Sequence, residues 1–173
     1  GIRSTAIGIS SNATGDHSLA IGLNSTASGD TSVALGWYSR AHENFSVAMG
    51  YFSTASADNA LAIGTSSWAR ENNSIALGNV AQAHSLSAIA IGNSTRASGE
   101  NSIAIGSNAI TAANNTISIG TGNIVGGENS GAIGDPSIVN ATNSYSVGNN
   151  NNLAAGQNGV FAFGNNITTT TDN

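Results

Sequence analysis

Large apolar and very small side chains alternate in a five-residue phrase that recurs along almost the whole chain. The phrase is clear at residues 18–22 (SLAIG), 32–36 (SVALG) and 102–106 (SIAIG), and each copy ends in glycine. Strict alternation is typical of a β-strand with two unlike faces. Here one face carries Leu, Ile or Val, and the other carries Ser, Ala and Gly.

The closing glycines are 14 residues apart from the first to the eleventh, and a twelfth follows after 16. They are Gly8, Gly22, Gly36, Gly50, Gly64, Gly78, Gly92, Gly106, Gly120, Gly134, Gly148 and Gly164. A fixed period of this kind is typical of a repeat architecture in which one small unit stacks on copies of itself.

A second set of small residues follows the glycines of the earlier repeats, with Ser three positions on from Ser11 to Ser67 and Ala five positions on from Ala13 to Ala97. Two strands of about five residues and two corners use up the unit, and at about 3.3 Å per residue such a coil encloses a very thin space. Only Ala, Ser and Gly fit inside. The sequence therefore predicts an all-β fold, a parallel β-roll of 14-residue coils stacked about 4.8 Å apart.

The large apolar residues must then point out of the roll, where each would lose about 1.5–3 kcal/mol if left in water. An apolar stripe of this length exceeds what a monomer normally exposes, so we expect an obligate oligomer held by this face. The expected interface residues are Leu19, Ile21, Val33, Leu35, Val47, Met49, Leu61, Ile63, Ile75, Leu77, Ile89, Ile91, Ile103 and Ile105.

Composition and charge narrow the possible partners. The chain has 22 Gly, one Pro, 8% charged residues and a net charge of −5 with four Arg and no Lys, so we expect no nucleic-acid partner. It has no cysteine, no apolar run of about 18 residues, and no signal peptide before the repeat begins at Gly1. We therefore expect an excised fragment without direct membrane contact.

Candidate chemistry is sparse. The three histidines, His17, His42 and His84, lie in different columns or distant coils, and no metal, calcium-roll or nucleophile motif has the required spacing. We expect no enzyme activity, no cofactor and no metal.

Long polar side chains gather in two columns four and six residues after the glycine. The candidate ligand-binding residues in these columns are Arg40, His42, Trp68, Arg70, His84 and Arg96. Arg and Trp are typical anchors of protein interfaces. The alternative is a solvated outer face whose long side chains keep other sheets from pairing with it.

The two corners of the coil differ. Trp37, Tyr38, Tyr51 and Phe52 follow the glycine in adjacent coils, where we expect them to stack and to extend the apolar stripe between subunits rather than form a binding patch. Acids gather seven or eight residues after the glycine, as at Asp16 and Asp30, and we expect them to alternate with Asn rather than form ion pairs.

The phrases of residues 18–30 and 102–106 resemble the YadA-like head of trimeric autotransporter adhesins. The resemblance implies a left-handed parallel β-roll, a homotrimer, and a bacterial cell surface location with an anchor in the outer membrane through a region absent from this chain. It also implies cell adhesion and virulence through host matrix proteins such as collagen, fibronectin or laminin, with possible autoaggregation. The alternative is a rigid spacer or fibre shaft with the adhesive site elsewhere.

The repeat changes along the chain. We expect regular head repeats over residues 1–106, divergent head repeats over 107–164, and a tail toward a missing neck or stalk over 165–173. After Gly106 the fourth position becomes Ile110, Ile124 and Ile138, and the fifth becomes Thr or larger, which predicts a different cross-section.

Overall fold

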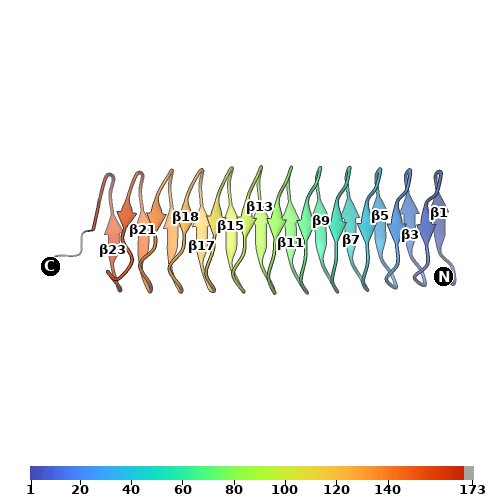
Figure 1. The fold of residues 1–173 in the computed structure, drawn as a ribbon, viewed down its shortest axis with the longest axis horizontal. Helices are drawn as coiled ribbons and strands as arrows, with labels where there is room; N and C mark the ends of the chain where they lie inside the picture. Colours follow the sequence, from blue (N-terminus) through green and yellow to red (C-terminus); the bar gives the residue numbers. More distant parts are fainter. Residues whose placement is uncertain (170–173) are drawn as a thin grey trace.

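The chain forms one elongated roll of stacked coils, with its two ends at opposite ends of the roll (Figure 1). The computed structural model describes residues 1–169. Successive strands alternate between two parallel sheets, so each coil contributes one strand to each sheet. The predicted all-β parallel roll of 14-residue coils is confirmed.

The first sheet has 12 strands, and all of them carry odd numbers that increase in order across the sheet. Its strands are β1 (Thr5–Ile7), β3 (Leu19–Ile21), β5 (Val33–Leu35), β7 (Val47–Met49), β9 (Leu61–Ile63), β11 (Ile75–Leu77), β13 (Ile89–Ile91), β15 (Ile103–Ile105), β17 (Ile117–Ile119), β19 (Gly131–Ile133), β21 (Tyr145–Val147) and β23 (Phe161–Phe163).

The second sheet has 11 shorter strands. They are β2 (Asn12–Ala13), β4 (Thr26–Ala27), β6 (Arg40–Ala41), β8 (Thr54–Ala55), β10 (Trp68–Ala69), β12 (Gln82–Ala83), β14 (Arg96–Ala97), β16 (Ile110–Thr111), β18 (Ile124–Val125), β20 (Ile138–Val139) and β22 (Asn152–Leu153).

Each strand pairs in parallel with the equivalent strand of the next coil, residue for residue. Leu19 is paired with Val33 and Ala20 with Ala34, for example. This register places each sequence column in a line along the roll. The strands are three and two residues long, not about five as the sequence predicted. The corners take the remaining residues because each contains a left-handed turn.

Both corners use the same turn. From Arg3 to Asn115 every seventh residue has a positive φ near +55°, so the 14-residue unit contains two similar half-units. The serine after this residue closes the turn: the Ser25 hydroxyl donates to the Gly22 carbonyl at 3.0 Å, and the Ser18 hydroxyl donates to the Gly15 carbonyl at 2.6 Å. These serines are buried and hydrogen-bonded, as polar groups in a narrow interior must be.

The strict glycine column belongs to only one of the two corners. Gly36, for example, has φ +130°, and a Cβ there would lie 2.6 Å from the Gly50 carbonyl oxygen of the next coil. At the other corner the equivalent position is Gly29 in one coil and Glu43 in the next, and Glu43 does not have a positive φ. The positive φ therefore requires glycine at the first corner, whereas Gly29 has no positive φ and is restricted only by space, since a Cβ there would lie 2.0 Å from the Glu43 carbonyl oxygen.

The interior of the regular part is filled by alanine and serine. The alanine columns form one continuous buried cluster that runs from Ala20 to Ala109. Further along, Val125, Val139 and Leu153 are fully buried in the column that Ala27 and Ala83 occupy in earlier coils. The predicted change of cross-section after Gly106 is therefore a wider interior within the same two sheets.

The roll continues through its last coils despite a two-residue insertion between Gly148 and Gly164. The buried Asn151 side chain holds this region, because its Nδ2 group donates to the Gly164 carbonyl at 2.8 Å and to the Ser146 hydroxyl at 2.9 Å. Thr168 still pairs with Asn152, so within the expected tail this residue continues the second sheet. Residues 170–173 of that tail lie outside the described residues.

We expect Gly36→Ala to lower the free energy of unfolding by about 1–3 kcal/mol, because alanine must adopt a backbone angle that favours glycine. Glu43→Ala, at the equivalent place of the other corner in the same coil, is the matched control and should have little effect. Chemical denaturation at one fixed protein concentration measures both. Equal effects of the two substitutions would contradict the assigned role of the glycine column.

We expect Ala83→Val and Val139→Ala both to destabilise the protein, although they are opposite changes in the same column. Valine at position 83 overpacks a thin coil, at about 1–3 kcal/mol. Alanine at position 139 leaves a cavity in a wider coil, at about 2 kcal/mol. Thermal and chemical denaturation measure both effects. A neutral or stabilising Ala83→Val would mean that the regular interior has room to spare.

Candidate functional site

The outer face of the first sheet carries the apolar stripe predicted to form the subunit interface. All the predicted interface residues, from Leu19 to Ile105, lie on strands β3 to β15 with their side chains on this face. Stacking on one another leaves most of them half-buried, while Met49 and Leu77 remain 37% and 39% exposed. In the single chain the stripe is therefore open to solvent along the regular part of the roll.

Four aromatic side chains gather at the corner that follows β5 and β7. Trp37 packs edge-on against Tyr51 with ring centroids 5.2 Å apart, and Tyr38 stacks on Phe52 at 4.8 Å. This confirms the predicted stacking between adjacent coils. Trp37 and Tyr51 remain 48% and 43% exposed, so the cluster widens the apolar surface beside the stripe. Its place between subunits stays a prediction.

The acidic corner is a ladder of side chains that accept from backbone amides of the preceding coil. Asp30 Oδ1 accepts from the Asp16 N–H at 2.8 Å, Asn44 Oδ1 from the Asp30 N–H at 2.9 Å, and Asp58 Oδ1 from the Asn44 N–H at 3.0 Å. Asp and Asn alternate from Asp30 to Asn72, as predicted, but Asp16 and Asp30 are direct neighbours in the ladder. Either side chain supplies the required acceptor, so the aspartates of this ladder stabilise the corner itself.

A second ladder of this kind was missed in the sequence. It lies at the glycine corner of the last coils, where Asn149 Oδ1 accepts from the Asp135 N–H at 2.8 Å and Asn165 Oδ1 accepts from the Asn149 N–H at 2.8 Å. The signal was present, because Asp or Asn follows the glycine in three successive coils at residues 135, 149 and 165.

The outer face of the second sheet carries a compact cluster of Trp68, Arg70, His84 and Arg96, here called the Trp68 cluster. The Arg70 guanidinium carbon lies 3.7 Å from the centre of the Trp68 ring, a cation–π contact. The Trp68 Nε1–H donates to the Ser56 hydroxyl at 3.1 Å, and the His84 ring approaches edge-on at 6.2 Å. Trp68 is thus fixed from three directions.

His84 is the electrostatically perturbed member of the cluster. Burial of the ring lowers its pKa below the usual 6.5, and the positive charges of Arg70 and Arg96 lower that pKa further. Its Nε2 atom is buried without a hydrogen-bond partner within the described residues. The cluster therefore joins two arginines around a mainly neutral imidazole.

Of the six predicted ligand-binding residues, the structure brings these four together. Arg40 pairs in register with Thr54, which pairs with Trp68, so Arg40 lies two strands away, at about 10 Å. His42 is exposed in the same coil as Arg40. Arg40 and His42 therefore form an outlying part of the predicted surface.

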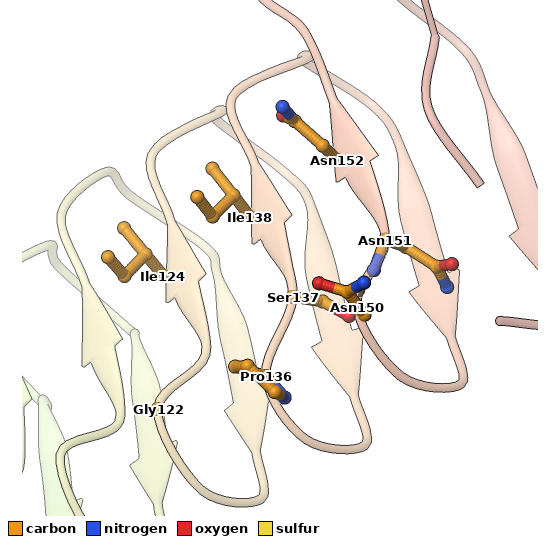
Figure 2. A pocket seen from close by; sticks show the side chains of 8 residues that line it. All are labelled: Gly122, Ile124, Pro136, Ser137, Ile138, Asn150, Asn151 and Asn152. Atoms are coloured by element: carbon orange, nitrogen blue, oxygen red, sulfur yellow. Dashed lines mark hydrogen bonds between the residues drawn. The ribbon is translucent and has the colours of Figure 1, made fainter. Parts of the chain in front are cut away.

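A shallow apolar groove of about 240 Å³ lies further along the same outer face. Figure 2 shows Ile124 and Ile138 side by side on β18 and β20, with Asn152 next in the column. Pro136 and Gly122 line the corner below. Ile124 and Ile138 are each 38% exposed. The sequence analysis identified the change to Ile at this position but did not predict the groove that results from it.

Two kinds of site are not found in residues 1–169. No group of three or more His, Asp or Glu side chains there could hold a metal ion. That part of the chain also has no helix of the length and apolarity that crossing a membrane requires.

Comparison with known proteins identifies proteins to which the repeat is similar. The family model described as YadA head domain repeat matches eight overlapping segments: residues 1–25, 13–39, 27–53, 41–67, 55–81, 69–95, 83–109 and 97–123. The crystal structure of the collagen-binding domain of the Yersinia adhesin YadA is similar, with a TM-score of 0.71 and 32% sequence identity over 76% of this chain and 80% of that one. No curated protein gives a significant match.

We expect an NMR titration to give His84 a pKa below 6.5 in the folded protein. Arg96→Gln should raise that pKa part of the way back, because it removes one neighbouring positive charge but not the burial. A His84 pKa at or above 6.5 would contradict the described surroundings of the ring.

The same shift predicts a small pH dependence of stability. The folded state binds the His84 proton more weakly than the unfolded state does. The contribution of neutral His84 to the free energy of unfolding is therefore complete above pH 6.5 and falls as the pH drops below that value. His84→Gln should flatten this part of the stability profile between pH 7 and 5. An unchanged profile would assign the pH dependence to other groups.

Proposed function

The chain belongs to the family of YadA head domain repeats, and from this we propose that it is a bacterial surface adhesin head that binds host extracellular-matrix proteins. The observation that carries the proposal is the likeness to the YadA collagen-binding domain, which spans three quarters of the chain. Collagen is therefore the first ligand to test, and fibronectin, laminin and autoaggregation follow. The role is non-catalytic.

The surface of the roll supports this role. Its outer faces repeat every coil, about 4.8 Å along the axis, and present rows of side chains rather than a deep cavity. An extended polypeptide can lie along or across such rows and make many similar contacts. Within this surface we assign the ligand contacts to Arg40, His42, Trp68, Arg70, His84 and Arg96, of which the Trp68 cluster is the organised part.

The functional unit in this proposal is a homotrimer. The apolar stripe of the first sheet faces the common axis, and the second sheet faces outward with its charged and aromatic residues. The trimer count comes from the resemblance to trimeric autotransporter adhesins. We place the trimer on the outer surface of a Gram-negative bacterium, anchored in the outer membrane by another part of the protein, where it would contribute to virulence.

A rigid spacer is the second candidate. The unbroken register of both sheets along the roll favours it, because such a rod could hold an adhesive site at a distance. The two functions differ in one observable property, since a spacer binds no matrix protein.

We expect the trimer to bind immobilised collagen saturably, and the triple substitution of Arg40, Trp68 and Arg70 by Ala to weaken this binding about tenfold or more. Arg3→Ala, which removes the arginine outside the proposed surface, is the control and should bind like the unchanged protein. Solid-phase assays on collagen, fibronectin and laminin measure the effect. Absence of binding to all three would favour the spacer, and equal binding by the triple variant would exclude this surface.

A further inference from the structure

The Trp68 cluster holds two of the four arginines of a chain whose net charge is −5. Arg70 follows β10 and Arg96 begins β14, so the two lie on strands two coils apart on one face. Both side chains are exposed. At about 4.8 Å per coil the arginines are about 10 Å apart along the roll. This is the one place among the described residues where two arginines and a histidine interact electrostatically.

The Trp68 ring positions the Arg70 side chain. One ring face is covered by the guanidinium at 3.7 Å, the His84 ring approaches edge-on, and the indole N–H is already bonded to Ser56. A guanidinium stacked on a ring still has its N–H groups free in the guanidinium plane. The contact therefore limits the motion of Arg70 and presents a planar fork that matches a carboxylate.

We propose that the Trp68 cluster is an anion-binding site for a short acidic polypeptide segment, with Arg70 and Arg96 each contacting one carboxylate. Two carboxylates three residues apart in a polyproline II segment lie on the same side of the chain, about 9 Å apart at about 3.1 Å per residue, which is close to the spacing of the two arginines along the roll. The His84 ring lies between the two arginines in sequence register and interacts electrostatically with both.

The surroundings favour a short acidic segment over a long polyanion such as a sulfated glycan. The corner that follows each strand of the second sheet is acidic in this part of the roll. It carries Asp58, Glu71 and Glu100, of which Glu71 and Glu100 are exposed. Along the axis, the column of Arg96 continues as Ile110 and Ile124. A long polyanion that continued past Arg96 would meet apolar surface within one coil, whereas two carboxylates would not.

The inference rests on the proposed adhesive function only in taking a protein as the ligand. The test uses the whole chain in its native assembly and two immobilised peptides, Gly-Ser-Asp-Gly-Ser-Asp-Gly-Ser and the same peptide with both Asp replaced by Asn. Surface plasmon resonance at low salt should show binding to the Asp peptide at least about tenfold stronger than to the Asn peptide. Raising the salt to about 0.3 M should weaken it, because exposed charge pairs are screened.

Variants assign the binding to the cluster. Arg70→Gln with Arg96→Gln should weaken Asp-peptide binding about tenfold or more, while Arg3→Gln should stay within about twofold. Trp68→Leu should weaken Asp-peptide binding. Trp68→Phe keeps a ring under Arg70 and should therefore retain most of the binding. Unchanged circular dichroism and mass of the assembly establish that each variant is folded.

Three results would overturn the inference: equal binding of the two peptides, equal behaviour of the double variant and Arg3→Gln, or binding of a sulfated hexasaccharide without binding of the Asp peptide. The proposed function fails separately. A protein that binds the Asp peptide but no matrix protein overturns the adhesive role and leaves the site standing. A protein that binds collagen but not the Asp peptide supports the adhesive role and overturns the proposed anion-binding site.

Discussion

The width of the space inside each coil limits what the sequence can place there. Over the regular part of the roll the interior holds alanine and serine whose side chains are completely buried. Many of the coils are closed by turns in which a buried serine hydroxyl donates to a backbone carbonyl. With so little apolar area inside, the fold depends on backbone hydrogen bonds between coils and on whatever covers the outside. Large apolar residues have only the outer face left, which reverses the usual arrangement of a globular core.

This constraint explains how the repeat can change without breaking the roll. Where the interior admits Val125, Val139 and Leu153, the second sheet gains Ile124 and Ile138 on its outside. The first sheet changes as well, because the Tyr145 ring lies over Gly131 and would contact any side chain there within 2.9 Å. The second sheet thus gains apolar surface toward the end of the roll, while the first sheet keeps exposed apolar residues at Ile133, Tyr145 and Phe161. The groove results from this gain.

Distance from the nearest closing glycine was enough to predict the columns, because a fixed period and a strict register make position in the unit equal to position in the cross-section. It correctly placed Ala20 inside, Leu19 outside, Trp37 beside Tyr51, and Asp30 beside Asn44. Strand lengths were overestimated, because the positive φ at residues such as Val80 and Phe45 cannot be read from residue types that normally avoid it. Contacts that cross columns were also missed, including the bond from Trp68 to Ser56, because they depend on rotamers rather than on spacing.

The central claim is that the outward stripe is the real core of the protein and is buried only by association. Light scattering on the purified chain tests it most directly. The account predicts a mass of three times 17.1 kDa, and an assembly lost together with the fold when Ile63→Asp and Ile91→Asp place charges in the stripe. A folded, soluble species of 17.1 kDa, or a double variant of unchanged mass and fold, would contradict it.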